Sequence, residues 1–320
     1  MNSNIFSTDR PWHTLDSELK KQFHAKVYKL SLQSGCSCPN RDGTAGTGGC
    51  TFCSAGGSGD FAAEPAPVEQ QIRQAKARVA DKMKKAPPAY IAYFQSYTNT
   101  YGDTDRLEEM YACALRQPEI VGLSIATRPD CLEPEKLDML ERLKALGPVW
   151  VELGLQTVND GTAAAFNRGY ETSVYEEAYR ELKARNIDVI THLILGLPGE
   201  NRDDVFESVS RVSRLWREYE PAPFDGVKLQ LLHVLKGTVM GESYLQEPFP
   251  VLSREDYTDL LIDCIERLPQ ELVIHRLTGD GPRSLLLAPM WSTDKKRVLN
   301  GIGKRMRERG TWQGRLADQS

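Results

Sequence analysis

The sequence lacks the features that would place it in a membrane or outside the cell. Its longest apolar runs, such as VITHLILGL, stop far short of the ~20 residues that a membrane-spanning helix needs. The first residues, MNSNIFSTDRPWHTL, do not show the basic segment followed by an apolar one that marks a secretory signal. We therefore expect a cytoplasmic protein without a membrane partner.

Cysteine is scarce, and it is unevenly distributed. The 320 residues include seven cysteines, and an odd number in a chain expected inside the cell argues against a disulfide framework and for metal-binding or catalytic thiols. Three of them, Cys38, Cys50 and Cys53, lie in one Gly-rich stretch, CPNRDGTAGTGGCTFC. No second three-cysteine motif follows, so the sequence predicts one such site and no auxiliary one.

These three thiols are typical of a metal site, and two kinds of site fit them. Thiolates are soft ligands that suit iron–sulfur clusters and zinc. A cuboidal cluster normally takes four thiolates, so a site with only three leaves one iron open for a substrate-like ligand and indicates catalysis. Alternatively, Cys36 supplies a fourth sulfur. That set predicts a four-thiolate zinc site in a nucleic-acid-binding module.

Hydrophobic periodicity predicts the architecture. Residues 26–33 (KVYKLSLQ) predict a strand that runs into the cysteine loop. Further apolar strands are predicted at Tyr90–Phe94, Val121–Ile125, Val149–Leu153, Val189–Leu195 and Gly226–Leu232, and they alternate with amphipathic stretches at Pro67–Lys85, Arg106–Gln117, Pro134–Leu146, Val174–Arg185 and Asp203–Glu218. This alternation implies right-handed βαβ units around a parallel sheet. Six such strands make an incomplete barrel, with functional residues at the carboxyl ends of the strands.

Several segments together resemble one protein family. The loop that ends in Cys-Thr-Phe-Cys resembles the radical S-adenosylmethionine (SAM) superfamily, although its C-x11-C spacing is longer than the usual C-x3-C. TRPD (127–130) and VELGLQ (151–156) resemble the Elongator catalytic subunit, and HLILGLPGE (192–200) is common to that protein and many radical SAM enzymes. With YFQSYTNTY, LLHVLKGT and HRLTGD, the chain is identified as a member of the YhcC/YtqA-like radical SAM family.

The resemblance implies a fold, cofactors and a reaction. It implies an α/β fold: a partial (β/α)6 TIM-type barrel at residues 26–235, an N-terminal extension at 1–25, and an α-rich C-terminal extension at 236–320 that closes the barrel and carries a basic helix. It implies a [4Fe–4S] cluster on Cys38, Cys50 and Cys53 that binds SAM and cleaves it to a 5′-deoxyadenosyl radical. A reducing donor such as flavodoxin or ferredoxin is the expected electron source.

The same resemblance predicts residues that contact SAM. Gln95, Ser96 and Thr98 follow the second strand, where the superfamily grips the methionine amino group, although polar residues are common at loop starts in any case. A charged Glu152 is costly to bury unless it is paired, and Arg128 is its expected partner. Alternatively, the guanidinium of Arg128 binds the SAM carboxylate through two parallel hydrogen bonds. The full set of predicted contacts is Phe52, Gln95, Ser96, Thr98, Ser124, Arg128, Glu152, Gln156, Leu195 and Gly196.

The remaining cysteines and two histidines have less specific patterns. Cys264 and Cys113 fall on apolar helical faces and are predicted to pack. Cys131 directly follows TRPD at the predicted mouth, so we assign it a catalytic role in quenching or receiving a radical, with simple packing as the alternative. His233 and His275 are candidates for substrate contact or for structural roles.

The substrate is predicted from charge and analogy. The segment 294–315 holds eight basic and two acidic residues, an excess of +6 in a chain of net charge −4. Such a segment suits phosphates, but Val298, Leu299, Ile302 and Met306 recur at helical spacing and equally predict an amphipathic helix packed on the barrel. The resemblance to Elongator favours tRNA as partner and a wobble-uridine modification as the reaction. The alternative is a radical SAM enzyme for a small metabolite or peptide.

Overall fold

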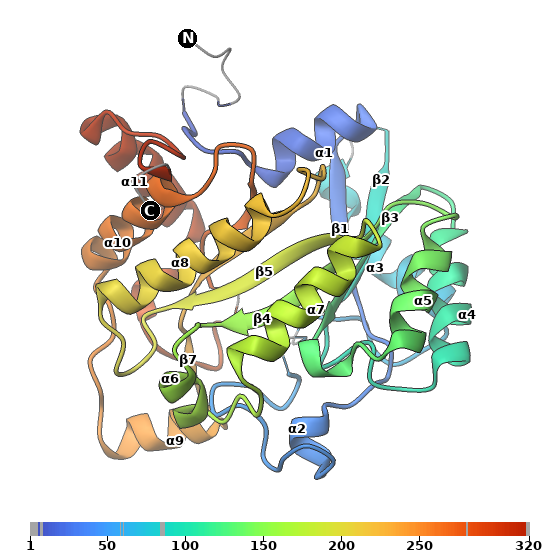
Figure 1. Ribbon diagram of the computed structural model, residues 1–320, viewed down its shortest axis with the longest axis horizontal. Coiled ribbons are helices and arrows are strands. Elements are labelled where there is room, and N and C mark those ends of the chain that lie inside the picture. The colour runs from blue at the N-terminus through green and yellow to red at the C-terminus, as the bar shows by residue number, and fades with distance from the viewer. Residues whose placement is uncertain are drawn as a thin grey trace.

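A parallel β-sheet with helices along its outer face forms the body of the protein (Figure 1). The computed structural model describes residues 6, 9–57, 59, 61–83, 87–279 and 281–317. Asp280, the last residue of the HRLTGD segment, lies outside the described residues, as do residues 1–5, 7–8 and 318–320 of the two predicted extensions.

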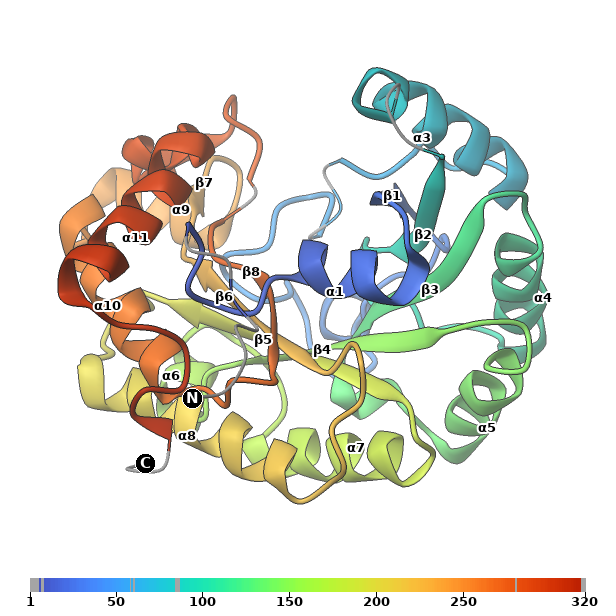
Figure 2. The same ribbon diagram turned by 90° about the horizontal axis from the view of Figure 1, so that it is seen from above.

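Seven parallel strands pair in the order in which they occur in the chain. The strands are β1 (Val27–Leu32), β2 (Ala89–Phe94), β3 (Ile120–Thr127), β4 (Val149–Gln156), β5 (Asp188–Leu195), β6 (Gly226–Leu231) and β8 (Val273–Arg276). The sheet curls, and β1 and β8 form the two edges of an incomplete barrel (Figure 2). The predicted α/β partial barrel and its six strands are confirmed. The seventh, β8, comes from the predicted C-terminal extension and continues the same sheet.

Helices cover the outside of the curl (Figure 2). The six that follow strands are α3 (Val68–Met83), α4 (Thr104–Leu115), α5 (Pro134–Leu143), α7 (Thr172–Ala184), α8 (Arg202–Arg217) and α10 (Arg254–Arg267). The others are α1 (Leu15–Phe23), α2 (Pro39–Asp42), α6 (Asp160–Ala165), α9 (Val239–Gln246), α11 (Lys295–Arg309) and the 3₁₀ helices at Pro129–Cys131 and Met290–Thr293. A two-stranded antiparallel ribbon joins β7 (Val234–Leu235) to β9 (Leu286–Ala288).

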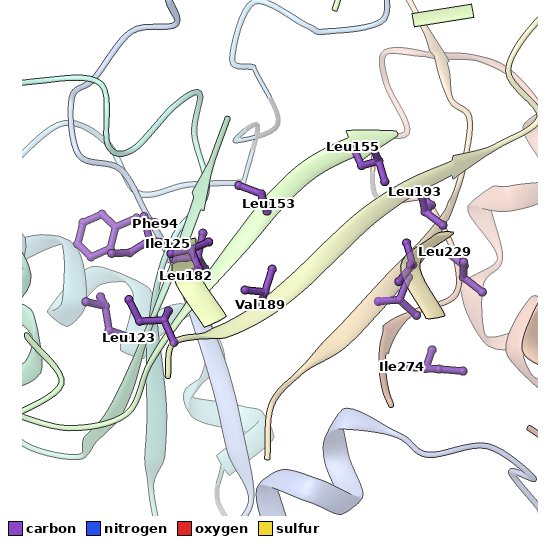
Figure 3. Packing of buried hydrophobic residues seen from close by; sticks show 14 of the residues in the cluster. Phe94, Leu123, Ile125, Leu153, Leu155, Leu182, Val189, Leu193, Leu229 and Ile274 are labelled. Carbon is purple, nitrogen blue, oxygen red and sulfur yellow. The ribbon is translucent and has the colours of Figure 1, made fainter. Parts of the chain in front are cut away.

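The core lies between the outer face of the sheet and the helices. Side chains such as Leu123, Leu153 and Leu193 alternate along the strands and are at most 1 % exposed (Figure 3). A second, smaller cluster fills the inside of the barrel near the amino ends of the strands. Its members are Leu19 of α1 with Ile91, Trp150, Ile190 and Phe224. This apolar floor leaves the carboxyl end of the barrel interior for polar groups.

The two ends of the described chain meet beside β8. The backbone N–H of Ile274 donates to the carbonyl of His13 at 2.8 Å, and that of Gln313 donates to the carbonyl of Pro11 at 2.9 Å. The fully buried side chain of Gln313 accepts from the N–H of His13 at 2.8 Å and donates to the carbonyls of Pro269 and Leu272. The amino-terminal segment and the carboxyl-terminal segment thus hold one edge of the sheet together.

The basic segment forms α11, which packs on α10. Val298, Ile302 and Met306 are at most 2 % exposed, as the helical spacing predicts. On its outer face Arg305 pairs with Asp259 of α10, and Arg309 pairs with both Asp259 and Asp263. Part of the basic charge is therefore already balanced within the protein. Contact of this helix with RNA stays a prediction.

Candidate active site

Two adjoining cavities open at the carboxyl ends of the strands. The first, called here the thiol pocket, is lined by Cys38, Cys50 and Cys53 together with side chains from β3, β4 and β5. The second, called the inner pocket, lies towards β6 and β8. The two share lining residues, namely Phe52, Cys53, Gly57, His192, Ile194 and Gln230. They are consequently two parts of one continuous site.

The cysteine loop is held in place by the segment that follows α6. Asn40 donates through Nδ2 to the carbonyl of Asn167 at 2.6 Å, and Asn167 donates to the carbonyl of Gly49 at 2.9 Å. Arg41 donates to the carbonyls of Cys53 and Ser54 at 3.1 and 2.6 Å. Because backbone groups receive these bonds, the loop keeps its shape independently of the thiols, which are left to line the pocket.

The three thiols line one pocket, and two of them interact directly. A hydrogen bond shared with Cys53 lowers the pKa of Cys50, and the charge of Arg128 lowers it further against the effect of burial. Among the described residues, no three or more His, Cys, Asp or Glu side chains form a group that could hold a metal ion. The three thiols do line one pocket, and soft thiolates are the donors that an iron–sulfur cluster takes.

Cys36 lies apart from the other three thiols. It is 8 % exposed, belongs to the main apolar core, and is absent from the residues that line the thiol pocket. Arg106 of α4 contacts its Sγ, with 3.4 Å between Nη2 and sulfur. A tetrahedral zinc site needs four donors around one ion, and this arrangement does not bring Cys36 to the other thiols.

A layer of charged side chains centred on Glu152 lies above the apolar floor, and its members Glu152, His192 and Lys228 line the pockets. Its Oε1 accepts from Lys29 Nζ at 2.5 Å and from Ser124 Oγ at 2.9 Å. Its Oε2 is 3.0 Å from His192 Nε2 and accepts from Lys228 Nζ. Burial alone would raise the pKa of Glu152, but the charges of Lys228 and Lys29 and the His192 hydrogen bond hold that pKa well below its usual value.

The predicted pairing of Arg128 with Glu152 is wrong. Arg128 instead forms a two-point ion pair with Asp130, with Nε–Oδ1 and Nη2–Oδ2 distances of 2.9 and 2.6 Å. Its third nitrogen donates to the carbonyl of Arg168 at 2.9 Å, and its guanidinium lies 4.7 Å from the ring centroid of Tyr170. The guanidinium of Arg128 therefore pairs with Asp130, its neighbour in the TRPD turn. The carboxylate of Glu152 pairs instead with Lys29 of β1 and Lys228 of β6.

Some of the other predicted SAM contacts line a pocket and some do not. Phe52, Gln95, Thr98, Glu152 and Gln156 line the pockets, and the ring of Phe52 packs at a tilt against that of Phe166 with a centroid distance of 5.2 Å. Ser96 is buried beside the cysteine loop and Ser124 is buried below Glu152. Leu195 and Gly196 do not line either pocket. The Leu195 side chain is in the core, and its carbonyl accepts from Leu232 at 2.9 Å. The roles of all these residues towards SAM remain predictions.

Cys131 lies outside the described lining of both pockets. It is 2 % exposed, and its thiol contacts Asp130 at 3.9 Å. Burial and the neighbouring carboxylate raise its thiol pKa. Cys131 therefore follows the carboxyl end of β3 as expected but is packed behind the pocket wall, in agreement with the alternative of simple packing, and its catalytic role stays a prediction. Cys264 is buried in the core as predicted.

Several lining residues are absent from the sequence-based prediction. Lys228, Tyr93 and Arg276 point into the inner pocket, and Arg41 and Tyr170 line the thiol pocket. Lys228 occupies an inward position in the mostly apolar strand GVKLQL, so a charge inside a buried strand was the available signal. Tyr170 lies in the loop NRGYETS, which has no periodicity to identify it.

Comparison with known proteins decides the family. A model of the Radical SAM superfamily matches residues 41–212, and a model of the Radical SAM C-terminal domain matches residues 224–308. The chain belongs to the radical SAM superfamily. It is thus a radical SAM enzyme, and the cofactors of that superfamily are a [4Fe–4S] cluster and SAM. No helix among the described residues is long and apolar enough to cross a membrane.

Two bacterial proteins are similar to the chain along almost its whole length, and a further relative is similar over about half of it. Protein YtqA of Bacillus subtilis is 43 % identical, covering 99 % of this chain and 97 % of its own, and YhcC of Escherichia coli K12 is 36 % identical over 92 % and 91 %. A tRNA uridine(34) acetyltransferase of Dehalococcoides mccartyi is 30 % identical over 54 % of this chain and 36 % of its own. The solved structure of Elp3 from Methanocaldococcus infernus superposes with a TM-score of 0.67 at 16 % identity, over 92 % of this chain and 67 % of that one.

Proposed function

We propose that this radical SAM enzyme remodels the side chain of the wobble uridine in tRNA. The observation that carries the proposal is the similarity to a tRNA uridine(34) acetyltransferase, together with the shared fold with Elp3. The chain spans about a third of that acetyltransferase, so the whole reaction of the relative does not transfer. Under the proposal, this chain shares with the acetyltransferase only the target nucleoside, and its own chemistry is the abstraction of a hydrogen atom.

The chain supplies a site for the cofactors of this reaction. Cys38, Cys50 and Cys53 are the residues that would hold the cluster, and Gln156 and Tyr170 line the same pocket, where SAM would bind. When bound, the cluster and SAM supply a carbon-centred radical that takes a hydrogen atom from the substrate. The protein contributes binding and orientation. Phe52, packed on Phe166, shields the loop from water, and Arg41 fixes the backbone of Cys53.

The charged layer gives the site a fixed electrostatic environment. Burial and the charge of Lys228 lower the pKa of His192 to about 4, so its imidazole is neutral at neutral pH. Glu152 stays ionised under the same conditions because two lysines surround it. A substrate that enters the site near neutral pH therefore meets a neutral imidazole at His192 and an ionised carboxylate at Glu152.

The experiment that tests the proposal is a nucleoside profile of bulk tRNA from a strain that lacks the gene. We expect one modified wobble uridine to disappear and a precursor to accumulate, with rescue by the wild-type gene and by Cys36→Ala, but not by Cys53→Ala. An unchanged nucleoside profile in the deletion strain would contradict a role in tRNA. Loss of rescue by both variants would point to a folding defect instead of a cluster defect.

A second candidate is a radical SAM enzyme that acts on a small metabolite or peptide. The ion pairs of Arg305 and Arg309 with α10 favour it, because they withdraw cations from the surface expected to meet RNA phosphates. Neutralising Lys304, Arg305 and Arg307 together separates the two. Under the tRNA proposal the triple variant binds tRNA more weakly and with a smaller salt dependence. Absence of tRNA binding by the wild-type enzyme, with activity unaffected in the triple variant, would favour the metabolite.

A further inference from the structure

The side chain of Asn40 links two of the cysteines that line the thiol pocket. Asn40 follows Cys38 by two residues, in the single turn of α2, and it is fully buried. Its amide nitrogen, Nδ2, lies 3.9 Å from the Sγ atom of Cys50. Sulfur is a large and weak acceptor, so a separation of this length is a weak N–H···S hydrogen bond.

The orientation of the Asn40 amide is fixed by a second acceptor. Nδ2 also donates to the backbone carbonyl of Asn167 at 2.6 Å. Because a carbonyl oxygen only accepts, the nitrogen of the amide, and not its oxygen, must face Asn167. The NH2 group carries two hydrogens. With one given to Asn167, the other is free to point at the sulfur of Cys50.

The backbone around Asn40 holds Cys50 in register with it. The carbonyl of Asn40 accepts from the N–H of Gly49 at 2.8 Å, and the N–H of Thr51 donates to the carbonyl of Phe166 at 2.9 Å. The residues on either side of Cys50 are thus tied to α2 and to the segment that follows α6. The amide of Asn40 and the thiol of Cys50 therefore keep a fixed separation.

The amide of Asn40 is present at a cost to the fold. Its Oδ1 atom is buried and has no hydrogen-bond partner among the described residues. The chain packs so closely around this oxygen that a Cβ atom at Gly46 or Gly169 would lie 2.3 or 2.9 Å from it. A buried carbonyl oxygen without a donor is unfavourable, and an apolar side chain would avoid that penalty. What the amide contributes here is therefore its two N–H groups.

A hydrogen bond to a cysteine sulfur alters the reduction potential of a cluster that this sulfur binds. Reduction adds an electron, and part of the added negative charge resides on the thiolate sulfurs. An N–H group directed at one of them stabilises the reduced form more than the oxidised form. The donor therefore raises the potential, in the way that groups around the ligands of a metal site commonly adjust it.

We propose that Asn40 is a positioning residue for the iron–sulfur cluster, and that its N–H group directed at Cys50 Sγ raises the reduction potential of that cluster. A cluster of higher potential accepts an electron from a weaker one-electron donor. The inference concerns the cofactor and not the substrate, so it stands or falls separately from the tRNA proposal.

The experiment is a redox titration of the full-length protein, reconstituted with iron and sulfide under anaerobic conditions and without SAM. Asn40→Ala and Asn40→Leu both remove the amide, one with a smaller and one with a larger side chain, so a shift common to both is not an effect of volume. We expect each variant to favour the oxidised cluster by about threefold to tenfold, which lowers the midpoint potential of a one-electron couple by about 28 to 59 mV. Electron paramagnetic resonance of the reduced cluster at successive potentials measures the shift.

The matched control is Asn167→Gly. The side chain of Asn167 holds the same loop through backbone carbonyls, those of Thr47 and Gly49, at 3.1 and 2.9 Å. The carbonyl of residue 167, which receives the hydrogen bond from Asn40, remains in the variant. Glycine also suits the positive φ of 59° at this position. We expect Asn167→Gly to keep the midpoint potential of the wild type.

Iron and sulfide contents and thermal midpoints establish that each variant is folded and loaded. A lower potential in the Asn40 variants with an unchanged one in Asn167→Gly supports the inference, and if only one Asn40 variant retains iron, that variant decides. Wild-type potentials in the Asn40 variants overturn it. A shift of the same size in Asn167→Gly also overturns it, because the potential would then follow the shape of the loop. If neither Asn40 variant binds iron, Asn40 builds the site and does not tune it, and the inference is again overturned.

Discussion

Cys36 and Cys38 are two residues apart but have different surroundings. Cys38 precedes α2 and lines the thiol pocket, whereas the thiol of Cys36 lies in the core against Arg106. The structure therefore predicts different results from the same substitution. After reconstitution, Cys38→Ala, Cys50→Ala and Cys53→Ala each lose most of the iron and sulfide, while Cys36→Ala retains wild-type content. Colorimetric iron and sulfide assays check this, and zinc retained only when all four cysteines are present would refute the assignment.

Glu200 makes the stability of the protein depend on pH. Burial raises its pKa to about 7, and the nearby Asp204 adds to the effect despite the hydrogen bond from Thr157. The folded form thus holds this proton more tightly than the unfolded form, whose pKa is near 4.5. The associated stability is present below pH 4.5 and is lost as the pH rises towards 7.

Replacing Glu200 by Gln removes this titration. We expect the thermal midpoint of Glu200→Gln to gain on that of the wild type as the pH rises from 4.5 to 7. Thermal melts at successive pH values through that window measure the difference. Parallel profiles for the two proteins would show that Glu200 does not titrate in this range.

At the scale of elements, Arg168 connects the end of β4 to α6 and α7. Its side chain is 1 % exposed and donates to the carbonyls of Leu155, Thr157 and Tyr170 at 2.7 to 2.9 Å. It also pairs with Asp160, which is half exposed, so the ion pair contributes less than the three backbone bonds. Arg168 thereby positions Arg128 and Tyr170, which face the thiol pocket.

We expect Arg168→Met to lower the free energy of unfolding by about 3–5 kcal/mol, because it leaves the carbonyls of Thr157 and Tyr170 without that donor and leaves the carbonyl of Leu155 with only the N–H of Thr157. Urea unfolding followed by circular dichroism measures the loss. Arg180→Met is the matched control: that arginine lies on the exposed face of α7 and pairs with Glu218, so its removal costs about 0–1 kcal/mol. Equal losses in both variants would disprove the role given to Arg168.

The elements were predictable from sequence to different degrees. The strands from β2 to β6 are apolar runs between amphipathic helices, and the structure moves their ends by at most three residues. Strand β8, VIHR, is four residues long and carries two polar side chains, so no periodicity distinguishes it from a loop. Glu152 was recognisable as a buried charge that needs partners. Its partners Lys29 and Lys228 lie on β1 and β6, and only the curl of the sheet brings them to it.

At the scale of the whole molecule, Gln313 links the two ends of the chain. Its side-chain amide forms hydrogen bonds with three backbone groups, the N–H of His13 and the carbonyls of Pro269 and Leu272. We expect Gln313→Ala to cost about 1–3 kcal/mol of unfolding free energy, since the N–H of His13 and the carbonyl of Leu272 lose their partner, while the carbonyl of Pro269 keeps the N–H of Leu272. Gln246→Ala, on the exposed end of α9, has little effect. Denaturant titration tests both. A Gln313→Ala protein as stable as the wild type would show that the chain ends do not support the sheet.

His13 and Gln313 are separated by 300 positions, which also sets an order of events during synthesis. At ~5–20 residues per second, the amino-terminal segment waits about 15 to 60 s for its partner to leave the ribosome. The cysteine loop, residues 38–53, emerges near the start of that interval, before the strands that form the rest of the barrel. A nascent chain at this stage has thiols without a pocket. We therefore expect cluster assembly to act on the released, finished protein rather than on the growing chain.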